Sequence, residues 1–398
     1  MSAPIVQGPI IQGWCPGALR PMLSGDGLVV RVRPRGGRLS ADQVAGIAAL
    51  SARHGNGLID LSSRANLQLR GVADVGYDAL MRGLQTLGLL DPSAGAEARR
   101  NILVTPFWQA GDGTQDIAAG LAEALAAPDA PELPGKFGFA VDTGPVPVLA
   151  AASADIRIEQ GLNGLICRAD GAATGVAVTP DTAVAAAIRL TRWFLQTGGA
   201  QGGRGRMAAH VERCGEKFSC ENFLGREDFS YEKSSFDRAV PGKQPLGYLV
   251  GLEFGQIAAV TLAGLGAMRL TPWRMLLLEG VQTPPNLPGL ITKADDPLLR
   301  VVACTGAPGC PQALQPTRDL ARGLARHVPM GCVLHVSGCG KGCAMPKVPA
   351  MTLVGESNGF GFVPNGLASD PPHLTGLTAG NLLAGPVLIT GGSDAAHL

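Results

Sequence analysis

The feature that most constrains the fold of this chain is an internal repeat. Residues 59–72 read IDLSSRANLQLRGV and residues 268–281 read MRLTPWRMLLLEGV. Aligned without gaps, the two segments share three leucines, one glycine and one valine. The flanking segments also follow the same order, which favours duplication over chance. A duplicated chain usually builds a pseudo-twofold protein, and the cleft between its halves is the natural place for a ligand.

Local signals around each copy predict a β-α-β-β unit. Residues 29–33 alternate like a strand, and Ser40 and Gln43 have the spacing of a capping box that opens a helix. Before the second copy, residues 248–254 are again strand-like, and we expect residues 256–267 to form the second helix.

A second pair of segments extends the repeat. Residues 135–141 and 331–337 both have the pattern of a glycine turn that leads into a strand. We therefore predict two related halves, residues 20–205 and 241–395, joined by the polar residues 206–240.

The composition and the apolar segments indicate a folded chain without a membrane span. Apolar residues make up 46% and charged residues 16% of the 398 residues, and the net charge is +1. No dense Lys/Arg run with interleaved aromatic residues is present, so we expect no nucleic-acid partner. The most apolar window, residues 247–268, is interrupted by Glu253 and Gln256 and favours a strand followed by a helix. Because no basic residue precedes the apolar N-terminal stretch, we expect no secretory signal and a cytoplasmic protein.

Two pairs of cysteines late in the chain carry the clearest chemistry. Cys304 and Cys310 lie six residues apart across a glycine- and proline-rich loop, and Cys339 and Cys343 lie four apart among glycines. Four thiolates in two pairs fit either a tetrahedral zinc ion or a [4Fe–4S] cluster. Cysteine pairs in zinc sites are usually two to four residues apart, so the longer first loop favours the cluster.

Together with the strand turn Leu61-Ser-Ser-Arg-Ala-Asn-Leu-Gln, the cysteine pairs and the duplicated unit resemble the sulfite and nitrite reductases that carry siroheme and a [4Fe–4S] cluster. The resemblance covers roughly residues 20–365. Within this superfamily, three stretches are similar to the precorrin-3B synthases of aerobic cobalamin biosynthesis. These are residues 338–346 (GCGKGCAMP), 270–274 (LTPWR) and 244–247 (QPLG).

The resemblance implies an α+β fold with a pseudo-twofold, sulfite/nitrite reductase-like architecture. Two ferredoxin-like half-domains, residues 20–95 and 241–290, would alternate with two mixed α/β domains, residues 96–205 and 291–395. Residues 206–240 would form the linker, and the last domain would carry the cluster.

The resemblance also implies roles for particular residues, with Cys304, Cys310, Cys339 and Cys343 as the cluster ligands. Arg64 matches an arginine that lies over the tetrapyrrole, Arg100 matches a second anion-contacting arginine, and Lys136 matches the first lysine of a Leu-Pro-x-Lys-Phe-Lys motif. We expect these three residues to be catalytic. The expected substrate-binding residues are Asn66, Gln68, Arg31, Arg33, Trp273 and Arg274.

Three departures from the reductases argue against reduction of sulfite or nitrite. Gly138 replaces the second lysine of the motif, and Lys341 appears where the reductases have Cys-Pro-Asn-x-Cys. The Asn-Gln expected in the second copy is Trp273-Arg274. These changes favour a different use of the tetrapyrrole pocket.

A precorrin is a flat macrocycle fringed with acetate and propionate groups, so its site needs cations at the rim. Arg31 and Arg33 share a strand face and predict a cationic stripe. Residues 198–206 (GGAQGGRGR) fit either a cradle for an anionic group or a flexible connection, and both alternatives stay open.

The resemblance to the synthases implies an oxygen-dependent monooxygenase that hydroxylates precorrin-3A at C20 while an acetate closes a γ-lactone. Because dioxygen takes electrons singly from a metal, it also implies a mononuclear non-haem iron, for which His335 and His210 are candidate ligands. No dinucleotide-binding glycine motif is present, so we expect an external electron donor. The alternatives are a sulfite or nitrite reductase with siroheme as its cofactor, and a cluster-bearing electron carrier.

Overall fold

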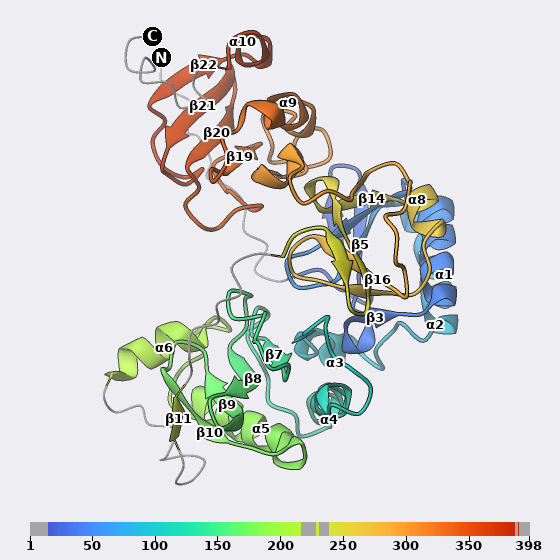
Figure 1. The fold of residues 1–398 in the computed structure, drawn as a ribbon, viewed down its shortest axis with the longest axis vertical. Coiled ribbons are helices and arrows are strands. Elements are labelled where there is room, and N and C mark those ends of the chain that lie inside the picture. Colours follow the sequence, from blue (N-terminus) through green and yellow to red (C-terminus); the bar gives the residue numbers. More distant parts are fainter. Residues whose placement is uncertain (1–14, 216–227, 231–238, 387–388, 390–398) are drawn as a thin grey trace.

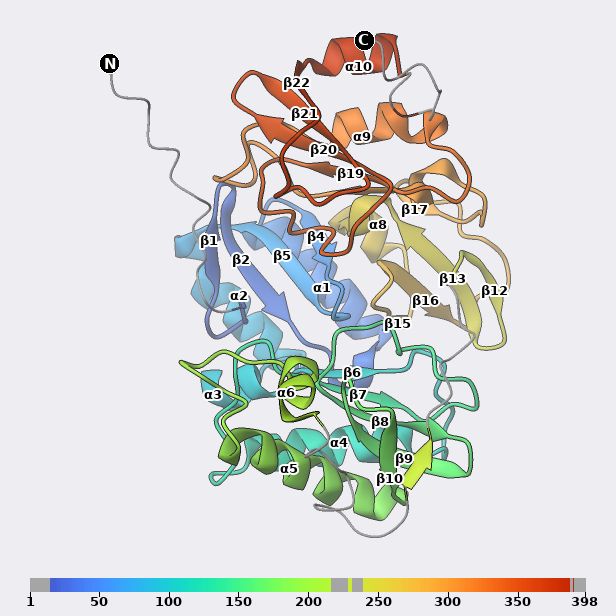
Figure 2. The same cartoon turned by 90° about the vertical axis from the view of Figure 1, so that its left-hand side faces the viewer.

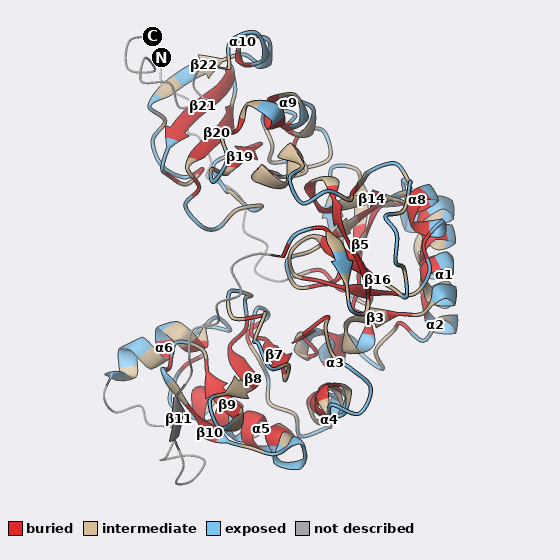
Figure 3. Cartoon of the chain, in the orientation of Figure 1, coloured by how far each residue is buried: buried red, intermediate tan, exposed pale blue. Residues whose placement is uncertain are grey.

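The structure, a computed structural model, describes residues 15–215, 228–230, 239–386 and 389. Figure 1 shows two sheets, built from residues of both halves, that lie between a unit of residues 94–215 and 228–230 and a unit that begins near residue 297. The described helices include none with the length and apolar character that crossing a bilayer requires. Figure 3 shows that the strands are largely buried, whereas the outer faces of α1 and α2 are exposed.

The first central sheet has the strand order β1-β2-β5-β4-β14 and is antiparallel throughout. The predicted capping box is confirmed, since Gln43 N donates to Ser40 Oγ at 3.2 Å and Ser40 N donates to Gln43 Oε1 at 3.0 Å. The elements of the first central sheet and its helices are β1 (Met22–Ser24), β2 (Gly27–Val32), α1 (Ala41–His54), β4 (Leu58–Leu61), β5 (Leu67–Val72), α2 (Asp74–Thr86) and β14 (Gln256–Ala258).

The second central sheet has the order β12-β13-β16-β15-β3, with β17 also paired to β13. Its turn between β15 and β16 matches the turn between β4 and β5. Ala65 and Arg274 occupy the same position in the two copies and both have a positive φ, of 52° and 60°. The elements are β3 (Arg38–Leu39), β12 (Gly242–Gln244), β13 (Gly247–Leu252), α8 (Ala259–Ala263), β15 (Met268–Leu270), β16 (Met275–Glu279) and β17 (Leu290–Ile291).

The two halves exchange strands. β14 of the second half pairs with β4, placing Ile257 opposite Ile59, while β3 of the first half pairs with β15, placing Arg38 opposite Arg269. Each exchanged strand follows a short 3-10 turn, η1 (Arg35–Gly37) or η3 (Glu253–Gly255). α1 packs on α8, and one hydrophobic core contains residues of both halves. The duplication predicted from the sequence therefore builds a single interlocked body.

The prediction of a helix over residues 256–267 was wrong in extent. Residues Gln256–Ala258 form β14, and the helix is only α8, which ends at Ala263 before Gly264. The exposed edge of β4 offers backbone hydrogen bonds to residues 256–258, and two glycines at 264 and 266 disfavour a longer helix.

The two outer units share one topology. In each, three parallel strands are followed by antiparallel ones, and the segments predicted to be equivalent supply the middle parallel strands, β7 and β19. The first unit contains α3 (Ala94–Arg99), β6 (Ile102–Val104), α4 (Thr114–Ala126), β7 (Phe139–Asp142), β8 (Ile156–Gly161), β9 (Gly164–Ala169), β10 (Thr174–Ala177), α5 (Pro180–Gln196), α6 (Met207–Cys214) and β11 (Asp228–Ser230). The second contains η4 (Pro297–Arg300), β18 (Val301–Ala303), α9 (Arg318–Leu324), η5 (Ala325–His327), β19 (Leu334–Ser337), β20 (Met351–Glu356), β21 (Gly359–Pro364), β22 (Leu374–Leu377) and α10 (Ala379–Ala384).

The α+β, pseudo-twofold fold class is confirmed by this arrangement, which Figure 2 shows from the side. The domain boundaries at residues 95, 205, 240 and 290 stay a prediction, and β3 and β14 each lie in the sheet of the other half. Within the predicted linker, Cys214 lies on α6, while Cys220 falls outside the described residues.

The strand exchange predicts that the two central sheets unfold together. Ile257 is 2% exposed, so Ile257→Ala should lower the free energy of unfolding by about 2–5 kcal/mol. In hydrogen exchange, the amides of β4 and β13 should lose protection to the same extent. Val260→Ala, at a residue 78% exposed on α8, is the control and should change little. Loss of protection confined to the β14 peptide would contradict the interlocked core.

Candidate functional site

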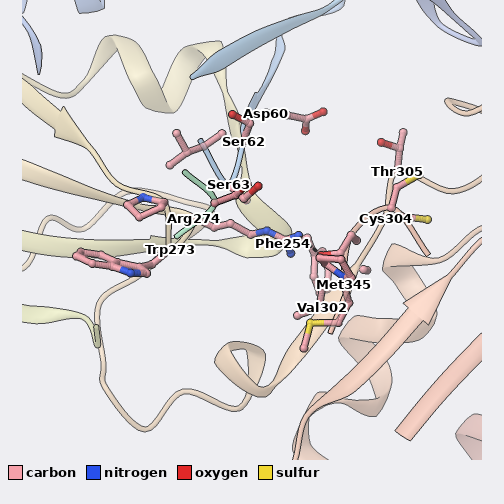
Figure 4. Close-up of a pocket in the computed structure, with 18 of the residues that line it drawn as sticks. Asp60, Ser62, Ser63, Phe254, Trp273, Arg274, Val302, Cys304, Thr305 and Met345 are labelled. Carbon is pink, nitrogen blue, oxygen red and sulfur yellow. Dashed lines mark hydrogen bonds between the residues drawn. The ribbon is translucent and has the colours of Figure 1, made fainter. Parts of the chain in front are cut away.

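A cavity of about 670 Å³ lies where the first central sheet, the second central sheet and the cysteine-bearing unit meet. This volume is within the range of small-molecule sites. Asp60 and Gln68 come from the first half, Trp273 and Arg274 from the turn of the second copy, and Cys304 from the loop after β18. Figure 4 shows Arg274 extending from its turn toward the cysteine-bearing unit, where its guanidinium donates to Ala344 O at 2.8 Å.

One face of the first central sheet forms a polar row beside this cavity. Arg31 on β2 lies opposite Gln68 on β5, Gln68 opposite Asp60 on β4, and Asp60 opposite Gln256 on β14. The other face carries apolar neighbours such as Ile59 and enters the shared core. Period-two alternation therefore turns every second residue of these strands toward the cavity. We call these four residues, Arg31, Gln68, Asp60 and Gln256, the polar row.

The two cysteine pairs come together because their loops follow adjacent parallel strands. Cys304 follows β18 and Cys339 follows β19, and the carboxyl ends of parallel neighbours lie at one sheet edge. Cys304 N donates to Val336 O at 3.3 Å, and Gly338 N donates to Cys304 Sγ at 3.1 Å. Cys304 and Cys343 also line the cavity. A metal group held here would therefore face whatever the cavity contains.

The four thiols interact electrostatically. Burial chiefly raises the pKa of Cys339 and of Cys343, and the neighbouring thiols at Cys304 and Cys310 raise both further. The described cysteines are all free thiols. Bringing four such groups together is unfavourable for a metal-free protein, because thiolates repel one another, and suits a site that binds metal through sulfur.

The two cysteine pairs offer four thiols, the number of ligands that both a tetrahedral zinc ion and a [4Fe–4S] cluster require. Thiolates on a single zinc lie about 3.8 Å apart, given Zn–S bonds of about 2.3 Å in a tetrahedron. Among the described residues there is no group of three or more His, Cys, Asp or Glu that could hold one metal ion. Each thiolate of a [4Fe–4S] cluster binds a different iron, so the four sulfurs stand further apart. The same finding leaves a mononuclear iron without a ligand set in the described part of the chain.

Two predicted arginines, Arg31 and Arg33, are buried and form no ion pair with a carboxylate of the described residues. They are 9% and 6% exposed, and burial lowers the pKa of Arg31 and lowers that of Arg33 to about 10. The Nε of each has no hydrogen-bond partner among the described residues. Arg31 also has a side-chain hydrogen bond with Cys15. Since a buried cation without a carboxylate partner is costly, these side chains suit a site that receives an anionic ligand.

Arg64, in the turn between β4 and β5, contacts the first outer unit next to Lys136. Arg64 donates to Lys136 O at 2.8 Å and to Ser153 Oγ at 3.3 Å, and Ser153 lines the cavity. Burial lowers the pKa of Arg64. The Lys136 side chain is exposed. Arg206, from the glycine-rich segment, donates to the same Ser153 hydroxyl at 3.0 Å and pairs with Asp155.

Other predicted residues have structural partners. Arg100 is buried, pairs with Asp91 at 2.7 Å and donates to Arg33 O at 2.9 Å. Asn66 is buried in the turn, where its backbone N–H donates to Ser62 Oγ. Trp273 lines the cavity and stacks on Phe107. The structure therefore brings Gln68, Trp273, Arg274, Cys304 and Cys343 to the cavity wall.

Sequence reasoning missed Asp60 and Arg318. Asp60 is the acidic residue in the cavity wall, and it accepts from Gln256 Nε2 at 2.8 Å and from Arg318 at 3.4 Å. Burial, and then the charge of Arg318, lowers the pKa of Arg274. The alternation of β4 places Asp60 on the same face as Ser62, and this pattern could have identified Asp60 as a site residue. No local pattern connects Asp60 to Arg318, which is 258 residues away in sequence.

The two histidines differ. His210 shares a hydrogen bond of 2.7 Å with Thr197 Oγ1 and packs on Trp193 and Phe194, so it has a structural role. His335 is 0% exposed, and neither ring nitrogen has a partner among the described residues. Burial, together with the charge of Arg274, lowers the pKa of His335 to about 4. Leaving such a group unpaired costs about 1–3 kcal/mol.

Asp142 supports the loop that carries the wall residues 151–153. Its Oδ2 accepts from Val148 N and Leu149 N at 2.6 Å each. The side chain is 1% exposed, and burial raises its pKa to about 6.

Comparison with known proteins defines the class. Residues 20–87 match the nitrite/sulfite reductase ferredoxin-like half domain. The fold is similar to that of the Mycobacterium tuberculosis NirA protein, with a TM-score of 0.63 and 18% identity over 90% of this chain and 79% of that chain. Fold and sequence thus place the chain in the sulfite/nitrite reductase superfamily.

Sequence relatives show to which family within this superfamily the chain belongs. A precorrin-3B synthase of Sinorhizobium sp. is 31% identical and covers 91% of this chain and 84% of its own length. A ferredoxin–nitrite reductase of Synechococcus elongatus is 26% identical over 84% of this chain and 77% of its own. The chain belongs to the precorrin-3B synthase family.

Asp142 makes a pH-dependent prediction. Between about pH 4 and pH 6 the folded state keeps a proton that the unfolded state has released, so folding stability falls as the pH rises through this window. The contribution is about 3 kcal/mol. Asp142→Asn should flatten the stability profile by this amount, measured by urea unfolding at several pH values. Asp129→Asn, at an exposed carboxylate, should leave the profile as it is. An unchanged slope in Asp142→Asn would contradict the assignment.

Proposed function

We propose that the chain is a precorrin-3B synthase that uses dioxygen to hydroxylate precorrin-3A at C20 while an acetate of the substrate closes a γ-lactone. The observation that carries the proposal is the cavity itself, whose lining includes Cys304 and Cys343, Arg274, and the two residues Asp60 and Gln68 of the polar row. Membership of the precorrin-3B synthase family supports the same substrate.

Cys304, Cys310, Cys339 and Cys343 would hold a [4Fe–4S] cluster. Such a cluster supplies electrons one at a time. The glycines around Cys339 and Cys343 let backbone amides approach the sulfurs, as the bond from Gly338 N to Cys304 Sγ illustrates. Because two of the four cysteines reach the cavity wall, the distance between cluster and ligand would be short.

The remaining wall residues would bind and orient the macrocycle. Arg274 on the wall, and Arg31 opposite Gln68 of the wall, would offer guanidinium groups to its carboxylates, and each charge-assisted hydrogen bond contributes about 1.5–3 kcal/mol. Trp273 offers a flat apolar surface beside the ring plane. Asp60 keeps Arg318 and Gln256 in place at one end of the cavity.

The reaction needs reactants that enter from outside the chain. One oxygen atom of dioxygen becomes the C20 hydroxyl and the other leaves as water, which consumes two electrons and two protons. The electrons would come from an external donor protein, and a mononuclear non-haem iron is part of the proposal, although the described residues offer no three-residue ligand set for it. Besides Cys304 and Cys343, the cavity lining includes Asp60 as an acidic residue.

One alternative is a siroheme-dependent sulfite or nitrite reductase, favoured by the similarity to ferredoxin–nitrite reductases. The surroundings of Gly138 oppose it. A Cβ at this position would lie 2.7 Å from Asn101 Nδ2 and 3.0 Å from Asn101 O, so a lysine here would require Asn101, which donates to Phe137 O at 3.0 Å, to move. The spectrum of anaerobically purified protein distinguishes the two, since siroheme bands would overturn the synthase proposal. Oxygen-dependent turnover of precorrin-3A would establish it.

Cysteine variants test the cluster. Cys339→Ser should lose most of the broad visible absorbance together with iron and acid-labile sulfide, because a hydroxyl is a poor ligand for the cluster. Cys332→Ser is the matched control, since Cys332 is a free, half-buried thiol just before the same strand, and it should retain all three. Wild-type iron and sulfide in Cys339→Ser would contradict the ligand assignment.

Arg31 tests the macrocycle site. Removal of a buried cation without a carboxylate ion pair should cost little stability, so Arg31→Met should stay within about 1 kcal/mol of the wild type in urea unfolding. Its affinity for precorrin-3A, followed by the change in macrocycle absorbance, should fall about 10- to 100-fold. Arg192→Met, at an exposed arginine, is the control and should bind normally. Unchanged affinity in Arg31→Met would remove Arg31 from the site.

A further inference from the structure

His335 occupies a defined place beneath the cysteine loops. It lies on β19, opposite Val302 of β18 and Thr352 of β20. Residues opposite each other on neighbouring strands point to the same face, and Val302 is part of the cavity wall. Leu334 and Val336, on the other face of β19, belong to the core with α9. The imidazole therefore lies on the cavity side of the sheet, with no exposure to solvent.

The edge of the imidazole faces the loop between Cys339 and Cys343. A Cβ built on Gly342 would lie 3.8 Å from His335 Cε1, and Cε1 is the carbon between the two ring nitrogens. Gly342 has a φ of 60°, which favours glycine, and it precedes Cys343 directly. Both nitrogens thus flank the contact with the loop that carries the last two cysteines.

No described protein group accepts a hydrogen bond from the N–H of this ring. The Thr352 hydroxyl donates to Gly366 O at 2.8 Å, and the Ser337 hydroxyl donates to Cys339 O at 2.7 Å. Arg274 lies close enough to influence the ring, but a guanidinium has only donors and cannot accept the imidazole N–H. Buried donors are almost always paired, so the missing acceptor belongs to something that the loop holds.

We propose that His335 donates a hydrogen bond to the sulfur shell of the cluster, meaning the thiolates of Cys339 and Cys343 and the inorganic sulfides, and thereby raises its reduction potential. The inference rests on the cluster assignment of the proposed function. A hydrogen bond to sulfur stabilises the reduced, more negative cluster over the oxidised one. His335 is a positioning and tuning residue, since it does not line the cavity.

The test is a redox titration of purified holoenzyme variants, followed by absorbance and by the electron paramagnetic resonance of the reduced cluster. His335→Leu removes the donor and fills the same buried volume. At a fixed solution potential, its ratio of reduced to oxidised cluster should fall about tenfold, which is about 59 mV for a one-electron couple. His335→Gln keeps an N–H donor and should lie closer to the wild type. His210→Leu, which removes the other buried histidine, should not shift the potential.

The outcomes separate this inference from the proposed function. Wild-type protein without iron and sulfide would overturn the cluster, and the role of His335 with it. A full cluster with an unchanged potential in His335→Leu, or an equal shift in the Leu and Gln variants, would overturn the role of His335 alone. Loss of the cluster in both variants would make His335 a structural residue and also overturn its tuning role. Loss in the Leu variant alone, with a normal potential in the Gln variant, would support the need for a donor.

Discussion

The pairing of β14 with β4, and of β3 with β15, is the constraint on which the rest of the structure depends. Each central sheet is completed by a strand from the other half, so neither β-α-β-β unit is whole by itself. The exchange fixes the two repeat turns relative to each other and brings Trp273 and Arg274 into one cavity wall with Asp60 and Gln68. Because β14 also carries Gln256, the same pairing that closes the hydrophobic core finishes the polar row above it. Stability and site geometry therefore share one set of backbone hydrogen bonds.

Charge is the second organising element. Arg31 and Arg33 are buried and Arg274 is half-buried, and loss of solvent lowers the pKa of each. By contrast, Arg100 is neutralised by Asp91, and Arg168 by Glu159, in pairs that hold the outer unit together. Among the described residues, Arg31, Arg33 and Arg274 have no carboxylate ion pair, and Arg274 lines the cavity while Arg31 lies opposite Gln68 of its wall. A protein tolerates this cost where a carboxylate-bearing ligand repays it on binding, which agrees with the macrocycle proposed as substrate.

Much of this could be predicted from the sequence, and the failures have a physical pattern. The duplication, the capping box at Ser40 and the two cysteine pairs could be predicted because each depends on the spacing of residues that lie close together in the sequence. Three residues of β14 were expected in a helix because their partner, β4, lies almost 200 residues earlier and no local pattern reveals it. Asp60 and Arg318 were missed for the same reason, since their contact spans two units. Arg100 has the expected sequence context, but its charge is used by Asp91, nine residues away along the chain.

The two copies of the repeat differ in the side chains that they place at equivalent positions. Where the first sheet has Gln68 facing the cavity, the second has Leu277, which is buried in a small apolar cluster with Leu249 and Met275. A symmetric ancestor assembled from two identical subunits would have presented two equal clefts. In this chain the position equivalent to Gln68 belongs to an apolar cluster, while the backbone of the two repeat turns remains alike. The second half thus supports the wall of this cavity through Trp273 and Arg274, and a single chain of 40.8 kDa contains both the supporting copy and the polar one.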